Sequence, residues 1–149
     1  MTGTQGLVLS VTRLDDRAQL PIYAHDGDAG LDLHCLRPYS LQPFERILIE
    51  TGIALAIPEG YAGFVIPRSG LAIKQGLSLV NTPGLIDSGY RGEIKVAAIN
   101  LDPRNVLTLD AGDRIAQLVV VPFARVAVVE VEALDETMRS SGGFGSTGR

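Results

Sequence analysis

Short apolar runs recur along the chain, and each of them is closed by residues that favour turns. Several runs alternate apolar and polar residues, which is the period of a strand with one buried face. Strands are predicted at Leu7–Thr12, Ile47–Thr51, Ala54–Ile57, Gly63–Pro67, Leu77–Asn81, Glu93–Leu101, Val106–Leu109, Ile115–Phe123 and Val126–Val131. Many short strands with turn signals between them indicate an all-β sandwich or barrel.

One segment has the features of a helix. Ser69–Gln75 begins with a serine that can cap its N-terminus, and Gly76 can end it. Parallel strands would need helical patterns of ~10–15 residues between them, and the sequence offers none. We therefore predict an all-β fold with a single short helix.

The final predicted strands have an unusual pattern, because Ala116–Val131 is apolar almost without alternation. A strand that is buried on both faces has this pattern, whereas a small barrel by itself buries one face of each strand. The segment indicates either contact with another subunit or two ordinary strands that expose some valines.

The length of 149 residues fits one domain, and the composition changes near its end. Residues 132–138 are mostly polar, and nearly all residues from Arg139 onward are Gly, Ser or Thr. We predict a β-barrel domain over residues 1–134 and a mobile C-terminal arm over residues 135–149.

Charge and composition exclude several classes of protein. The net charge of −4 and the low aromatic content, without tryptophan, argue against a protein that binds nucleic acid polymers. A single cysteine, Cys35, excludes an intrachain disulfide and favours the cytoplasm. No apolar run approaches the ~18–20 residues that cross a membrane, and no signal peptide is expected.

Common catalytic and metal motifs are missing. The lysines, Lys74 and Lys95, lie outside any phosphate-binding P-loop pattern, and Ser69 lies outside a G-x-S-x-G motif. The acidic run that begins at Asp26 lacks the glycine and glutamate spacing of a calcium loop. His34 and Cys35 are adjacent on a predicted strand and should face opposite sides, which disfavours a shared zinc ion.

Asp32 is the first candidate functional residue, and it stands between two leucines in the run Ala29–Leu33. On a strand it points away from both leucines. The pattern fits an aspartate that faces solvent. It also fits a carboxylate that orients a hydrated cation such as Mg²⁺, which usually keeps several waters and binds substrate phosphates.

Two further segments are candidates for binding an anion. Arg68, Ser69 and Gly70 place a guanidinium, a hydroxyl and free backbone N–H groups together at the start of the predicted helix. The alternative is a simple cap beside a surface arginine. Gln117 interrupts an apolar run, and a buried glutamine needs partners. A phosphate oxygen or an ordinary core contact would satisfy it.

Residues 81–94 resemble a hairpin whose tip is Asp87-Ser88-Gly89. The opening of such a hairpin exposes backbone donors and acceptors that can read the polar edge of a base. Tyr90 can pack its ring on a flat partner, and Asp87 can act as the general base that takes a proton from water. In the alternative interpretation Asp87 only stabilises the turn.

The predicted arm contains two residues that are out of place in a disordered Gly/Ser tail, Arg139 and Phe144. A tail of this composition is most often simply disordered. An arm that folds over a ligand would use the arginine on a phosphate and the phenylalanine over a ring.

Taken together, these segments resemble the five ordered motifs of homotrimeric deoxyuridine triphosphate nucleotidohydrolases (dUTPases). The matching segments are Ala29–Leu33, Pro67–Ala72, Gly84–Ile94, Gly112–Leu118 and Arg139–Gly148. The resemblance implies a jelly-roll-like β-barrel, a trimer with three shared active sites, and an arm that closes over a neighbour's site. It also implies Mg²⁺-assisted hydrolysis of dUTP to dUMP and pyrophosphate, which keeps uracil out of DNA and supplies dUMP for dTMP synthesis.

The resemblance assigns roles by position. Asp87 would activate the water that attacks the α-phosphorus, and Asp32 would lie near the water shell of the metal. Uracil and deoxyribose would be bound by Asn81, Gly84, Leu85, Ile86, Asp87 and Tyr90, with Tyr90 leaving no room for a 2′-hydroxyl. Lys95 would lie on the returning strand beside the substrate. The phosphates would be held by Arg68, Ser69, Gly70 and Gln117. From the arm, contacts would come from Arg139, Phe144, Gly145, Ser146 and Thr147.

Two other functions remain as alternatives. A dCTP deaminase shares the family fold, but those relatives typically carry a glutamate where this chain has Ala97 and a phenylalanine where it has Tyr90. A non-catalytic module that senses nucleotides or binds a partner could use the same barrel. The presence of Asp87 and of the complete arm argues against that as the sole role.

Overall fold

The computed structural model describes residues 6–138, 140–141 and 143 of the chain. Within them it forms strands and one short helix, in the order β1 (Ser10–Arg13), β2 (Leu31–His34), β3 (Tyr39–Leu41), β4 (Arg46–Ala56), β5 (Tyr61–Pro67), α1 (Ser69–Gln75), β6 (Leu77–Leu79), β7 (Gly84–Ile86), β8 (Glu93–Asn100), β9 (Leu107–Leu109) and β10 (Arg114–Pro122). The predicted all-β fold with one helix is confirmed.

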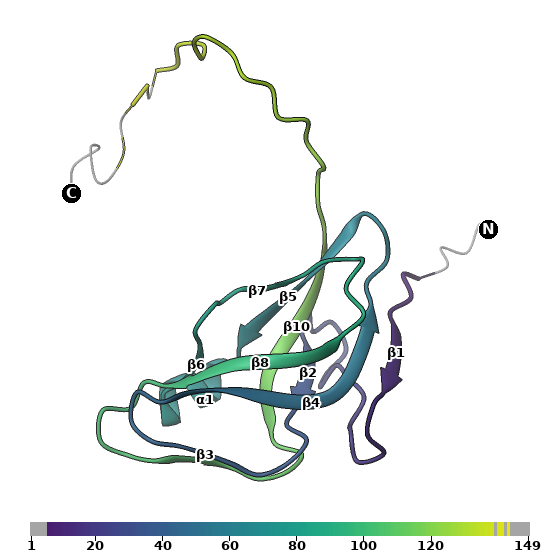
Figure 1. The fold of residues 1–149 in the computed structure, drawn as a ribbon, viewed down its shortest axis with the longest axis vertical. Coiled ribbons are helices and arrows are strands. Elements are labelled where there is room, and N and C mark those ends of the chain that lie inside the picture. Colours follow the sequence, from purple (N-terminus) through teal and green to yellow (C-terminus); the bar gives the residue numbers. More distant parts are fainter. Residues whose placement is uncertain (1–5, 139, 142, 144–149) are drawn as a thin grey trace.

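The strands form two four-stranded sheets and one small sheet, all antiparallel (Figure 1). One large sheet has the order β1-β4-β8-β6, and the other has the order β2-β10-β5-β7. Strands β3 and β9 make the third sheet. Strands that are distant in sequence therefore pair side by side, as in a jelly roll.

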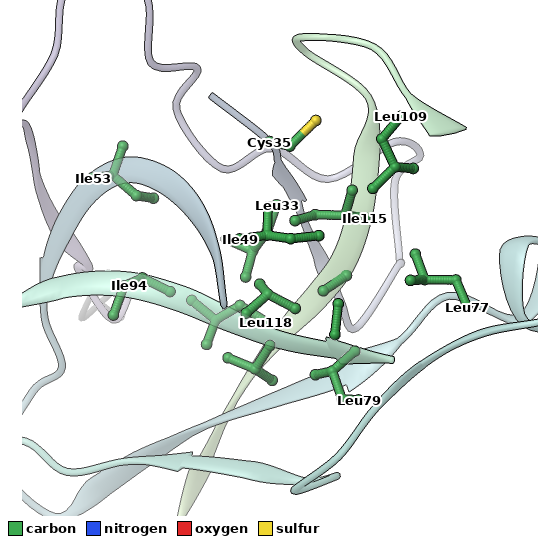
Figure 2. Close-up of a cluster of buried hydrophobic side chains, with 14 of the residues drawn as sticks. Leu33, Cys35, Ile49, Ile53, Leu77, Leu79, Ile94, Leu109, Ile115 and Leu118 are labelled. Atoms are coloured by element: carbon green, nitrogen blue, oxygen red, sulfur yellow. The ribbon is translucent and has the colours of Figure 1, made fainter. Parts of the chain in front are cut away.

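Side chains from both large sheets meet in one core (Figure 2). Ile49 and Val96 come from the first sheet, and Leu33 and Leu118 come from the second; each is at most 1% exposed. Burial of such aliphatic side chains contributes roughly 1.5–3 kcal/mol each. This shared core fixes the two sheets against each other and so fixes the loops between them.

Strand β4 runs through Gly52, where the sequence predicted a break between two strands. The pairing with β8 shifts between Glu50 and Ala54, so the strand continues through a bulge. Gly52 has a φ of 70°, which favours glycine, and its N–H donates to Glu93 Oε1 at 2.9 Å. The bulge therefore accommodates Gly52, and β4 continues on both sides of it.

The helix has the predicted bounds but not the predicted N-cap. The capping position is Arg68, in an extended conformation, and no side chain makes a capping hydrogen bond. Ser69 is instead the first helical residue and is exposed. The end is as predicted, because Gly76 adopts a left-handed conformation and its N–H donates to the carbonyl of Ala72.

The strand predicted at Val126–Val131 does not form in the single chain, so that prediction is wrong. Regular structure ends with β10, and the chain then leaves the sheets (Figure 1). A strand needs a neighbour to satisfy its backbone groups, and residues 123–131 pair with none of the described strands. Val128 is 94% exposed as a result.

In the described part of the chain, no helix has the length and apolar character that spanning a bilayer requires.

Candidate active site

The loop between β7 and β8 opens a pocket, because the two arms of this hairpin belong to different sheets. Strand β7 pairs only with β5, whereas β8 pairs with β4 and β6. Between the splayed arms lies a pocket of about 310 Å³. The predicted site residues that line it are Asn81, Gly84, Leu85, Ile86, Tyr90 and Lys95.

The β7 side of this pocket is a free sheet edge. Strand β7 is the last strand of its sheet, with β5 on one side and no described strand on the other. An edge strand presents unpaired backbone N–H and C=O groups. Residues Gly84–Ile86 can therefore offer backbone donors and acceptors to a flat polar ligand.

Asp87 follows β7 directly and begins the turn that leads to Tyr90. The N–H of Tyr90 donates to the carbonyl of Asp87 at 3.1 Å. The Arg91 guanidinium donates to the carbonyls of Ser88, at 2.6 Å, and Tyr90, at 2.9 Å. The Asp87 side chain is exposed. The turn is thus held by its own backbone and by Arg91, which leaves the carboxylate free to meet a ligand.

Lys95 lies on the other side of the pocket between two carboxylates. Its Nζ is 3.3 Å from Glu93 Oε2 and 3.6 Å from Glu50 Oε1. Hydrogen bonding to Glu93 and the charges of both glutamates raise the pKa of Lys95. The Glu50 carboxylate also pairs with Arg37. The lysine charge is therefore largely compensated, and this wall of the pocket is not strongly positive.

Asp32 lies in a second cluster, and its burial rules out the interpretation as a solvent-facing residue. The residue is 2% exposed. Its carboxylate is 3.0 Å from Arg68 Nε and 3.5 Å from an Arg114 terminal nitrogen. Arg114 was not a predicted site residue. Its position follows from the pairing of β10 with β2, which sets Arg114 opposite His34, and the sequence spacing does not reveal that register.

Both guanidiniums also border a surface depression of about 220 Å³. Arg68 is partly buried, and the Arg114 side chain is 49% exposed. A buried carboxylate between them holds both cations beside the start of α1, where Ser69 and Gly70 are exposed. Two oriented guanidiniums can bind an anion with several oxygens.

The Asp32 carboxylate keeps capacity for another donor. Its Oδ1 accepts no hydrogen bond from the described residues, because Arg68 Nε is close but its N–H is not aimed at that oxygen. No group of three or more His, Cys, Asp or Glu side chains among the described residues could hold a metal. This chemistry fits a Mg²⁺ ion that is carried by phosphates and reaches Asp32 through a bound water.

Gln117 stands beside Asp32 in the pairing of β10 with β2. It is partly exposed rather than buried. Gly30 leaves the room for it, since a Cβ at that glycine would lie 3.1 Å from Gln117 Oε1. Gly30 is therefore a supporting residue that the sequence pattern did not single out.

The core-facing wall of the pocket and the Asp32 cluster lie on opposite faces of one sheet. Val65, which lines the pocket, pairs with Leu118, and Ile66 pairs with Gln117. Paired residues share a face of a sheet and consecutive residues alternate. Gln117 and Asp32 therefore lie on the face opposite to Val65.

The predicted arm contacts cannot be placed, because Arg139, Phe144, Gly145, Ser146 and Thr147 lie outside the described residues.

Comparison with known proteins decides the family. The dUTPase family model matches residues 16–148, which is most of the chain. The chain belongs to the dUTPase family. The deoxyuridine 5'-triphosphate nucleotidohydrolase of Cutibacterium acnes is 58% identical over 129 residues, covering 87% of this chain and 85% of the relative. That of Thermobifida fusca is 54% identical, covering 94% of this chain and 78% of the relative.

Solved dUTPase structures share the fold. A mutant dUTPase of Staphylococcus bacteriophage 80alpha, bound to dUpNHpp, superposes with a TM-score of 0.90 at 30% identity, covering 95% of this chain and 99% of the other. A mutant dUTPase from phage phi11 of S. aureus, described with a structural Mg(II) ion, has a TM-score of 0.80 at 29% identity, covering 87% and 99%. The predicted family, the jelly-roll-like fold and the enzyme class, a dUTP diphosphatase, are confirmed.

Proposed function

We propose that this dUTPase hydrolyses dUTP to dUMP and pyrophosphate by attack of water on the α-phosphorus. The observation that carries the proposal is the splayed β7–β8 hairpin. Six predicted site residues line the pocket that it opens, namely Asn81, Gly84, Leu85, Ile86, Tyr90 and Lys95, and Asp87 follows β7 directly. The reaction would keep uracil out of DNA and supply dUMP for dTMP synthesis. The single cysteine fits the cytoplasm as the compartment.

Uracil recognition would come mainly from backbone groups. The free edge of β7 offers unpaired backbone N–H and C=O groups within Gly84–Ile86, and Asn81 adds a side-chain amide. These groups are fixed by pairing with β5, so they are oriented before the base arrives. Tyr90 would pack beside the deoxyribose and exclude a 2′-hydroxyl. Lys95 would border the same pocket with its charge already compensated.

The phosphates would bind at the Asp32 cluster. Arg68 and Arg114 supply positive charge, and Ser69, Gly70 and Gln117 supply neutral donors. Asp32 holds both guanidiniums in place, so part of its role is to orient them. A triphosphate carries several negative charges while the protein is acidic overall, so local cations must provide the attraction.

Mg²⁺ bound to the phosphates would neutralise charge that develops at the phosphoryl oxygens. The chain contributes the Asp32 Oδ1 acceptor toward such an ion through water. The Asp87 carboxylate would orient the attacking water and accept its proton. The attacking water would be aligned by Asp87, and the leaving pyrophosphate would be held by the arginines. This positioning would supply much of the reduction in activation free energy.

We further propose a homotrimer with active sites shared between subunits. Two features of the chain support it. The core-facing wall of the pocket and the Asp32 cluster lie on opposite faces of one sheet, which favours a site that a second subunit completes. The exposed valines of 126–131, such as Val126 and Val129, each 74% exposed, form an apolar segment that an additional subunit would cover. The arm over residues 135–149 would close over a neighbour's site.

The position of attack can be tested by hydrolysis of dUTP in water enriched in oxygen-18, with Mg²⁺ present. Attack on the α-phosphorus places the heavy oxygen in dUMP, and mass spectrometry of the products detects it there. Heavy oxygen in the pyrophosphate would show attack on the β-phosphorus and overturn the assigned role of Asp87.

A further inference from the structure

The ring of Tyr90 is folded back over its own loop. Its hydroxyl donates to the backbone carbonyl of Glu93 at 2.9 Å. The residue is still 47% exposed, and it lines the pocket. The ring therefore has one fixed side and one side that faces a ligand.

Gly92 lies directly against this ring. A Cβ at Gly92 would lie 2.5 Å from the Tyr90 hydroxyl oxygen, 2.7 Å from Cζ and 3.1 Å from Cε2. Non-bonded carbon atoms in contact normally stay about 3.5–4 Å apart. The ring can thus occupy its observed position only because residue 92 has no side chain.

We propose that Gly92 is a specificity-determining position that acts through Tyr90. Absence of a side chain at residue 92 lets the ring lie close to the loop, where it sets the width of the pocket beside the sugar. The inference rests on the proposed function, because it uses the role of Tyr90 against a 2′-hydroxyl. Gly92 itself is a positioning residue and touches no substrate atom.

The local structure separates this role from folding. Gly92 is exposed, and its backbone is outside the left-handed region, so alanine fits the main chain. The atoms that an added methyl group would meet belong to the far end of the Tyr90 side chain, which can rotate away. Gly92→Ala should therefore fold normally, break the hydrogen bond to Glu93 and displace the ring by about 1 Å.

The hairpin offers a matched control. Gly89 lies in the same loop and outside the left-handed region, and a Cβ there would meet nothing within 4 Å. Gly89→Ala adds the same methyl group and the same backbone stiffening without touching Tyr90. We expect Gly92→Ala to lower the ratio of kcat/KM for dUTP over UTP roughly tenfold, and Gly89→Ala to leave that ratio within about twofold of wild type.

A double-mutant cycle tests whether the effect passes through the ring. In a Tyr90→Ala background there is no ring to displace, so adding Gly92→Ala should change the dUTP to UTP ratio by less than about twofold. An equal loss of discrimination in both backgrounds would overturn the proposal, because Gly92 would then act on the loop rather than on Tyr90. An unchanged ratio in Gly92→Ala alone would also overturn it.

The position of the ring gives a measurement that does not depend on activity. A crystal structure of Gly92→Ala should show the Tyr90 hydroxyl beyond 3.5 Å from the Glu93 carbonyl oxygen. If wild type fails to prefer dUTP over UTP, the proposed function fails. The crystal structure of Gly92→Ala still tests whether Gly92 determines the position of the Tyr90 ring. If wild type prefers dUTP and the ring of Gly92→Ala stays in place, only the inference about Gly92 fails.

Discussion

Two aspartates of this dUTPase have opposite surroundings. Asp32 is almost fully buried, with guanidiniums on both sides of its carboxylate. Asp87 is exposed at a turn whose backbone groups are bonded to one another and to Arg91. The first carboxylate is committed to holding cations, whereas the second is available to a water molecule. We therefore propose a positioning role for Asp32 and proton transfer for Asp87.

Replacing the exposed carboxylate should remove catalysis without harming the fold. We expect Asp87→Asn to lower kcat by about 10²–10⁴-fold, which is the usual contribution of a general base, while KM for dUTP stays close to wild type. Steady-state release of pyrophosphate measures both constants. Near-normal turnover would remove Asp87 from the proposed role.

Cys35 provides a residue-scale test of burial. The thiol is in the core and donates to the carbonyl of Asp110, and desolvation raises its pKa (Figure 2). The reactive thiolate is therefore scarce and shielded in the folded protein. We expect iodoacetamide at pH 8 to label Cys35 only as fast as the protein opens, and rapidly in denaturant. Mass spectrometry follows the reaction, and labelling at the unfolded rate in buffer would contradict the buried position.

The residue scale also shows where prediction from sequence ends. The run Leu31-Asp32-Leu33 fixes the direction of the aspartate but not its exposure. Its burial depends on Arg68 and Arg114, which are remote in sequence and arrive only through the pairing of strands. Most of the hairpin residues line one pocket, because they are close in sequence and the turn brings them together, while their roles in binding stay predictions.

At the scale of elements, strongly apolar segments were predictable and short or unpaired ones were not. The segments at 61–67, 93–100 and 114–122 are long enough for their strand pattern to be recognised in the sequence. Strand β3 has three residues and no visible apolar period, and it was missed. Strands β6 and β9 are equally short, but they lie in the longer predicted segments Leu77–Asn81 and Val106–Leu109. The valines at 126–131 have strand composition, yet no described strand lies beside them.

Removal of the C-terminal arm tests an element that the resemblance assigns to catalysis. A variant that ends at Met138 keeps both large sheets and the whole pocket. We expect it to fold with wild-type thermal stability and to lose at least about tenfold in kcat/KM, because ligand contacts and exclusion of water are lost. Circular dichroism and the pyrophosphate assay measure the two effects. An unchanged rate would show that the arm has no part in the reaction.

At the scale of the whole molecule, the proposed site shared between subunits predicts that the protein assembles. We expect sedimentation equilibrium to give three times the chain mass of 15.8 kDa. A stable monomer with full activity would contradict the shared site. Assembly alone does not show which subunit supplies which residue, so a complementation experiment is needed.

Asp87→Asn and Arg68→Ala should each be inactive as pure trimers. When the two variants are unfolded and refolded together, mixed trimers can combine an intact Asp87 from one chain with an intact Arg68 from another. We expect part of the wild-type activity to return only in the mixture, with each variant refolded alone as the control. No recovery in mixed trimers would place both residues in a single-chain site.

The central claim is that the pocket between β7 and β8 selects dUTP. Its most direct test is the rate of pyrophosphate release from dUTP, dCTP, dTTP and UTP, each with Mg²⁺ and the wild-type protein. The β7 edge should accept uracil and reject cytosine and thymine, and Tyr90 should reject the ribose, so kcat/KM should be highest for dUTP by at least about a hundredfold. Equal rates on all four nucleotides, or a preference for dCTP, would contradict the account.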